Sequence, residues 1–329
     1  MTSDPRTHEH THEHTHEHTD EHTDEHTDDL GRHEGGHGLD HDAGHDAGYD
    51  AGHDAGHGAG HGGGHDDDGQ AGVLDLDAVV VGHLGGLTAW ARGHAPCAPR
   101  RVLDLGAGTG TGTFALARRF PQAQVLAVDS SPAMLDRLRV TAFGLDLGTR
   151  VRTLQADLDE GLPDVGPVDL AWAASSLHHL RHPDRLLAGL RQALEPGGTV
   201  LVVEMDGFPR FLPDDLGAGR PGLEDRCRDV MAAQGWNAHP DWGPHLQAAG
   251  LELLERRVFS YEPVPAPAAT ARYARRVLSG VRSRLADRLA ADDVRVLDVL
   301  LDDGAPGSLE RRGDLVVRST RTAWAARRA

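Results

Sequence analysis

The chain has 329 residues, with 51 acidic and 33 basic side chains and a formal net charge of −18. Residues 1–70 hold nineteen of the acidic residues and only two arginines, so the rest of the chain is close to neutral. A near-neutral body argues against nucleic acid as a partner. Two isolated cysteines exclude a disulfide framework, and no apolar run approaches the ~18 residues that would cross a membrane. These features predict a cytoplasmic protein.

Residues 1–70 repeat with a period of four. Thr-His-Glu-His occurs three times from Thr7, and from His33 to His65 a histidine returns every fourth residue, with Tyr49 substituting once. Frequent glycine and the lack of an apolar stripe predict a disordered tail. Imidazole suits zinc, nickel or copper, so the candidate metal ligands, none of them catalytic, are His8, His10, His12, His14, His16 and His18. The alternative is an expanded repeat that only solubilises the chain.

A mixed helix is predicted over residues 73–94, before the first strand. The apolar pair Val102 and Leu103 then leads into a loop with three alternate glycines, and the loop leads into a helix around residues 114–117. Such a turn has no side chains in the way, so a ligand can approach the backbone amides that open the helix. The loop therefore predicts a binding site.

Further apolar runs occupy residues 124–129, 151–157, 168–172 and 199–205, and helical sequence separates them. Strands that alternate with helices predict a parallel α/β sheet covered on both faces. Asp129 ends the second run about twenty residues after the glycine loop, where a carboxylate can accept hydrogen bonds from both hydroxyls of a ribose. The predicted ligand contains a nucleoside.

The loop spacing separates two classes of nucleoside cofactor. The dinucleotide fingerprint Gly-x-Gly-x-x-Gly fails, because Thr111 or Thr113 stands in its third position. The actual pattern, Asp104-x-Gly106-x-Gly108-x-Gly110, resembles motif I of the class I S-adenosylmethionine-dependent methyltransferases. The resemblance extends to acids that end strands two and three, and to a Pro-Gly-Gly turn at residues 196–198 before strand five. A nucleotide-dependent oxidoreductase is disfavoured.

The resemblance implies a Rossmann-like α/β fold: a mostly parallel seven-stranded sheet with an antiparallel last strand and helices on both faces. It also implies methyl transfer from S-adenosylmethionine to a small molecule by in-line displacement. An Asn-Pro-Pro-Tyr type of motif, used on nucleic-acid bases, is absent from the sequence. The alternative function is metal sequestration by the tail, with a catalytically silent methyltransferase-like body.

The predicted layout has a tail and one domain. The tail covers residues 1–70 and the domain covers 71–329. Within the domain we expect a cap helix at 73–94, a core at 100–206, a substrate-side insert at 207–245, strand six at 251–261, a helical lid at 268–302 and a last strand at 314–325. The aromatic residues of the insert either face the transferred methyl or only anchor a surface insertion.

By resemblance, the cofactor site has three parts. The methionine portion is expected at Asp104 and beside Gly106, Gly108 and Gly110, the ribose at Asp129, and the adenine at Asp157 and Leu158. Further cofactor contacts are expected at Ala107, Ser130 and Ser175. Any single aspartate at a strand end can instead be a turn or helix cap.

Two histidines, His178 and His179, follow strand four, where the family places residues near the sulfonium and the acceptor. Either one could act as the general base for a hydroxyl acceptor, because imidazole titrates near neutral pH. The alternative is that they cap or pack the start of a helix.

Overall fold

The computed structural model describes residues 65–329, and their side chains from residue 69 onward. Most of the predicted tail, including the six candidate metal ligands His8 to His18, lies outside the described residues. Helix α1, His65–Val81, includes the last six residues of the predicted tail, 65–70.

Seven strands form one sheet in the order β3-β2-β1-β4-β5-β7-β6. They are β1 Arg101–Leu105, β2 Gln124–Asp129, β3 Val151–Gln155, β4 Val168–Ala174, β5 Leu194–Met205, β6 Glu252–Tyr261 and β7 Ser319–Arg327. Strands β1 to β5 are parallel, and β7 runs antiparallel to both β5 and β6. The predicted fold class is confirmed.

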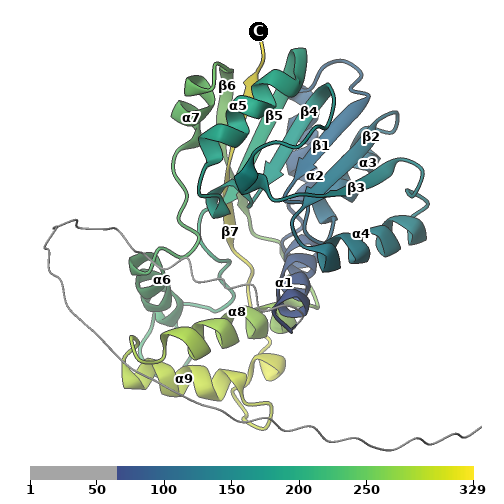
Figure 1. The fold of residues 1–329 in the computed structure, drawn as a ribbon. Helices are drawn as coiled ribbons and strands as arrows, with labels where there is room; N and C mark the ends of the chain where they lie inside the picture. Colours follow the sequence, from purple (N-terminus) through teal and green to yellow (C-terminus); the bar gives the residue numbers. More distant parts are fainter. Residues whose placement is uncertain (1–64) are drawn as a thin grey trace, which may run out of the picture. The chain divides into compact units, whose positions relative to one another are not determined.

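Helices cover both faces of the sheet, and a third group lies at its end (Figure 1). The other helices are α2 Leu84–His94, α3 Thr111–Arg119, α4 Pro132–Gly144, α5 Pro183–Ala193, α6 Leu223–Ala233, α7 Trp242–Ala248, α8 Thr270–Leu285 and α9 Ala291–Leu301. Residues of α2, α3 and α4 share one apolar cluster with the sheet, and residues of α5 and α7 share another. Apolar burial on both faces explains the continuous apolar runs at residues 170–174 of β4 and 200–203 of β5.

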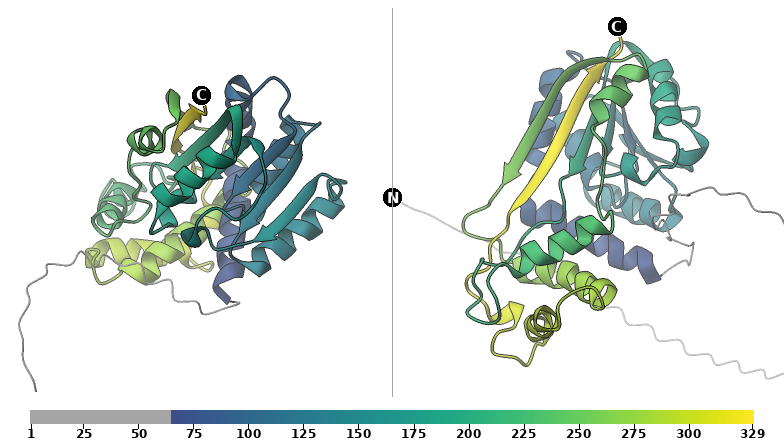
Figure 2. Two further views of the ribbon diagram at one scale, coloured as in Figure 1. Left: turned by 45° about the horizontal axis from the view of Figure 1, so that its top comes forward. Right: turned by 90° about the vertical axis from the view of Figure 1, so that its left-hand side faces the viewer.

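The third group packs beyond the carboxyl ends of the parallel strands. Helices α1, α6, α8 and α9 contribute to one apolar cluster that includes Phe211, Tyr273 and Leu297. Figure 2 shows β6 and β7 side by side, with α8 and α9 beyond the carboxyl end of β6. These helices therefore enclose the edge of the sheet from which the glycine loop emerges.

Three predicted elements differ from the structure. The predicted cap helix at 73–94 is two helices, because Gly82 takes the left-handed conformation (φ +68°) between α1 and α2. The predicted lid at 268–302 is the pair α8 and α9, with a break after Leu285. The last strand begins at Ser319 rather than at 314, because Val316 and Arg318 bond to residues 210 and 211 outside the main sheet.

Candidate active site

The glycine loop leaves the carboxyl end of β1 and turns sharply at Gly106. A Cβ on Gly106 would stand 2.5 Å from the Cβ of Ser176, and the backbone has φ +67°, so only glycine fits. Gly108 lies under helix α1, since its Cβ would stand 2.9 Å from Cδ1 of Leu74. The loop is therefore packed against the residues after β4 and covered by α1.

Asp129, the last residue of β2, fixes the other side of the loop. Its Oδ2 accepts a hydrogen bond from the Gly108 amide at 2.8 Å, and its Oδ1 accepts one from the Ser131 amide at 2.9 Å. The Ala107 amide donates to the carbonyl of Val128 at 3.0 Å. A carboxylate has about four acceptor positions, so Asp129 keeps capacity for further donors, such as sugar hydroxyls.

Asp104 lies inside β1, just before the loop. Its side chain is buried, and its Oδ2 accepts a hydrogen bond from the Thr113 hydroxyl at 2.6 Å. Burial raises the pKa of Asp104 to about 7; the hydrogen bond from Thr113 opposes the shift and the charge of Asp129 adds to it. This carboxyl therefore changes charge near neutral pH.

The third strand-end acid has a structural role. Asp157 is exposed, and its Oδ1 accepts a hydrogen bond from the Asp159 amide at 2.9 Å, which caps the 3₁₀ turn Leu158–Glu160. The carbonyl of Ser130 accepts a hydrogen bond from the Gln155 side chain at 3.2 Å. Asp157 therefore caps the turn that follows β3, as the alternative interpretation expects. The roles of Asp157, Leu158 and Ser130 toward a cofactor stay predictions.

The residues after β4 approach the loop with an unusual backbone. Ser175 has φ +49°, a conformation uncommon for a residue with a side chain, and its amide donates to the carbonyl of Val203 at 2.8 Å. The buried hydroxyl of Ser176, directly beneath Gly106, has no hydrogen-bond partner within residues 65–329. An unpaired buried hydroxyl at a loop of this kind is available to a ligand.

His178 is paired with a carboxylate that sequence reasoning did not select. It lies in the 3₁₀ turn Leu177–His179, and its Nδ1 is 2.8 Å from Oε2 of Glu204, near the end of β5. Glu204 is fully buried. The ring of His179 lies 4.0 Å from that of His178, centroid to centroid. Of the two predicted bases, His178 is oriented by a buried carboxylate.

A family model matches the part of the chain that holds most of this site. Residues 103–200, which run from β1 into β5, match a family described as a methyltransferase domain. This match supports a class I S-adenosylmethionine-dependent methyltransferase domain over these residues.

Two curated relatives illustrate the extent of the similarity. A trans-aconitate 2-methyltransferase of Acidovorax sp. strain JS42 is 41% identical over 119 residues, which cover 36% of this chain and 40% of the relative. A malonyl-[acyl-carrier protein] O-methyltransferase of Laribacter hongkongensis is 33% identical over 178 residues, 51% of this chain and 58% of the relative. The chain therefore spans about two fifths to three fifths of the length of these relatives.

Solved structures give a weaker similarity. The crystal structure of a putative methyltransferase from Bacillus halodurans C-125 superposes with a TM-score of 0.46 at 17% identity, covering 74% of this chain and 98% of that one.

A second histidine–carboxylate pair lies directly after β5. Nε2 of His239 lies 3.1 Å from Oδ1 of Asp206, and Nδ1 lies 3.0 Å from the carbonyl of Pro240. The Thr322 hydroxyl of β7 also donates to Asp206, at 2.9 Å. The hydrogen bond with Asp206 raises the pKa of His239. Because both ring nitrogens face acceptors, the doubly protonated imidazolium satisfies both contacts.

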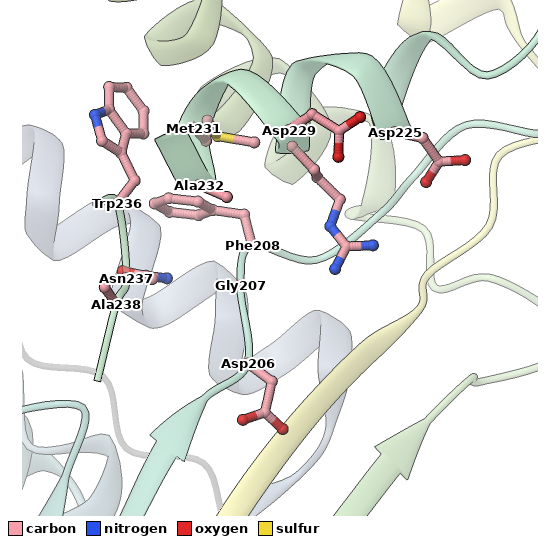
Figure 3. A pocket seen from close by; sticks show the side chains of 11 residues that line it. Asp206, Gly207, Phe208, Asp225, Asp229, Met231, Ala232, Trp236, Asn237 and Ala238 are labelled. Atoms are coloured by element: carbon pink, nitrogen blue, oxygen red, sulfur yellow. The ribbon is translucent and has the colours of Figure 1, made fainter. Parts of the chain in front are cut away.

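A cavity of about 400 Å³ opens beside this pair (Figure 3). Its walls come from the segment after β5, from helix α6 and from the segment before α7. The lining side chains include Phe208 and Trp236, whose rings meet edge to face at 6.1 Å. The size is that of a small-molecule site. The aromatic residues of the predicted insert thus form a cavity at the carboxyl edge of the sheet.

The described residues also bear on the predicted metal and membrane partners. Across residues 69–329, no group of three or more histidine, cysteine, aspartate or glutamate side chains is placed to hold a metal ion. No single helix among the described residues is long and apolar enough to cross a membrane. The segments Gly69–Val81 and Leu84–His94 together have the length and composition of a membrane span, but an 81° bend separates them.

Sequence reasoning missed Glu204, Asp206 and Arg228. A signal for Glu204 was present, because an acid within the otherwise apolar run of residues 200–205 must find a partner when the strand is buried. Asp206 and Arg228 had no such signal, because their surroundings are set by β7 and α6.

Proposed function

We propose that the protein transfers a methyl group from S-adenosylmethionine to a small-molecule acceptor by in-line displacement. The observation that carries the proposal is the bond from the Gly108 amide to Asp129, which joins the glycine loop to a strand-end acid that has spare acceptor capacity. Two relatives named for methyl transfer to trans-aconitate and to malonyl-[acyl-carrier protein] support a small-molecule acceptor.

Unpaired buried groups support a cofactor at this loop. Within the described residues, the hydroxyls of Thr109 and Ser176 are buried without partners, and both belong to the loop or to the turn beneath it. Following the resemblance, Asp129 and Ser130 would hold the ribose and Asp104 the amino group of the methionine portion. Ser175, Gly106, Ala107 and Gly110 would surround that portion, and Asp157 and Leu158 the adenine.

The cofactor, when bound, supplies a methyl group on a sulfonium, which makes the displacement easy once the partners are aligned. Helix α1 excludes water by covering the loop at Gly108. His178 would take the proton of a hydroxyl acceptor on Nε2, because its Nδ1 proton is directed to Glu204. The tautomer follows from this hydrogen bond. Glu204 would orient the ring and stabilise the imidazolium that forms.

Calorimetry on the full-length chain tests the cofactor assignment. We expect S-adenosylmethionine and S-adenosylhomocysteine to bind and NADH not to bind. The Asp129→Ala variant should lose binding, whereas Asp287→Ala, at an exposed site on the lid, should keep it. If the wild-type chain binds neither S-adenosylmethionine nor S-adenosylhomocysteine, the proposal is wrong. Binding of either ligand would justify a screen for the acceptor.

Metal sequestration by the tail stays the alternative proposal, supported by the histidine repeat alone. A deletion of residues 2–64 tests it without cutting into α1, which begins at His65. Unchanged cofactor binding and methyl transfer would favour the enzyme. Loss of cellular metal tolerance, together with no methyl transfer by the full-length chain, would favour sequestration.

A further inference from the structure

The cavity beside β5 combines an apolar wall with several charged groups (Figure 3). Phe208, Met231, Ala232 and Trp236 form the apolar part. The ionisable residues are three aspartates, Asp206, Asp225 and Asp229, and one arginine, Arg228. The class of molecule that the cavity can bind depends on which of these charges are already neutralised.

Two of the aspartates have cationic partners. Asp206 faces His239, whose two ring nitrogens both lie against acceptors, and this arrangement favours the imidazolium. Asp225 is exposed and forms an ion pair with Arg210 at 2.9 Å. Asp229 is exposed at the rim, where water screens its charge. The acidic groups therefore leave little net negative charge inside the cavity.

Arg228 has no such neutralising partner among residues 69–329. Within that range no hydrogen bond or ion pair joins its guanidinium to another residue. The guanidinium lies against Gly207: its Nη2 and Nε are 3.7 and 4.0 Å from the position that a Cβ of Gly207 would take. Because Gly207 has no side chain, nothing from that residue covers the planar guanidinium group of Arg228 on the side that lines the cavity. A planar guanidinium matches a carboxylate with two parallel hydrogen bonds.

We propose that this cavity binds the acceptor through a carboxylate held by Arg228, with the apolar body of the acceptor against Phe208 and Trp236. The cavity begins at the end of β5, and β4 separates β5 from β1, so strand spacing places it about 10 Å along the sheet edge from the glycine loop. An acceptor anchored at Arg228 extends its other end toward His178. The role in methylation rests on the proposed function, whereas the carboxylate site itself does not.

Binding of two matched probes tests the assignment. Calorimetry on the full-length chain, with saturating S-adenosylhomocysteine, compares 2-naphthoate with its neutral isostere 2-naphthamide. We expect the carboxylate to bind at least about tenfold more tightly. Arg228→Gln should remove most of this difference and leave the binding of 2-naphthamide unchanged. Arg276→Gln, which removes an exposed arginine of α8, is the matched control and should keep the difference. Trp236→Leu should weaken both probes.

Three outcomes would overturn the proposal: equal affinity for the two probes in the wild-type chain, no binding of either probe, or an undiminished preference for 2-naphthoate in Arg228→Gln. Binding of S-adenosylhomocysteine is measured on every variant, so that a folding defect is recognised. If 2-naphthoate binds with the expected preference but neither methyl-cycle ligand binds, the proposed function fails and the carboxylate site stands.

Discussion

Asp77 of helix α1 and Arg321 of strand β7 form an ion pair in the interior, 244 residues apart in sequence. Both residues are buried. The Tyr273 hydroxyl of α8 donates to the other oxygen of Asp77 at 2.9 Å. Leu74, one turn earlier on α1, is the residue that covers Gly108. The pair therefore fixes the helix that closes the glycine loop.

Removing one partner of this ion pair should destabilise the fold. We expect Asp77→Asn to lower the free energy of unfolding by about 3–5 kcal/mol, because the buried Arg321 would lose its counter-charge. Asp75→Asn breaks an exposed pair of the same helix, with Arg137, and should cost about 0–1 kcal/mol. Urea unfolding of the two variants measures both losses. Equal losses in the free energy of unfolding would contradict the predicted difference between the interior pair and the exposed pair.

Cofactor binding should release a proton at mildly acid pH. The pKa of Asp104 is raised to about 7 by burial, so at pH 6 the carboxyl is largely protonated before binding. A cationic amino group beside it favours the ionised form. Calorimetry with S-adenosylhomocysteine at pH 6, in two buffers of different ionisation enthalpy, should give different heats. Asp104→Asn should remove the difference; identical heats for the wild-type chain would contradict the assigned role of Asp104.

Stability should fall as pH rises from about 4.5 to 7. Burial raises the pKa of Asp104 and of Glu224 to about 7, and the bond to Asp206 raises that of His239. Groups with raised pKa values contribute stability that is present below their unfolded pKa and lost as pH passes the folded value. His83 has the opposite effect, because burial lowers its pKa to about 3. Its contribution makes stability rise with pH up to the ordinary histidine pKa of 6.5 and is constant above that pH.

Thermal unfolding at several pH values measures this slope. Glu224 accepts hydrogen bonds from the Phe211 and Leu212 amides, and glutamine can keep one acceptor there. Glu224→Gln should therefore make the slope shallower. A wild-type chain that grows more stable toward pH 7 would show that other groups dominate.

Mutation of the His178–Glu204 pair should affect turnover more than cofactor binding. If a hydroxyl is methylated, His178→Ala should lower kcat by about 10²–10⁴-fold, with the affinity for S-adenosylhomocysteine unchanged. Glu204→Gln should lower kcat less and shift the pH profile, because it alters the base only through its hydrogen bond. An unchanged kcat in His178→Ala would mean that the acceptor atom is already ionised.

The parts of the fold that depend on local sequence could be predicted. The loop at Gly106 and Gly108 and the strand that ends at Asp129 have local signals: glycine spacing, apolar runs and a terminal acid. The break at Gly82 was missed, because a glycine within a helical pattern does not by itself reveal a left-handed turn.

The contacts that define the acceptor side could not be predicted from single segments. Asp206 meets Thr322 only because β7 pairs antiparallel with β5, with Glu204 opposite Thr322 in the register. The open side of Arg228 likewise depends on how α6 packs against Gly207. Neither relationship has a local signature, so the family resemblance proposes a cofactor site at the glycine loop and leaves the acceptor chemistry open.

The position of β7 between β5 and β6 has a consequence for the order of folding. Strand β6 pairs with no strand except β7 in the described sheet, and β7 follows it in sequence after α8 and α9. During synthesis the five parallel strands can assemble first, while residues 252–261 present both edges without a partner until residues 319–327 have emerged. Joining two strands so far apart closes a long loop, which makes this step slow. In the interval, β6 is the segment most open to pairing with another chain.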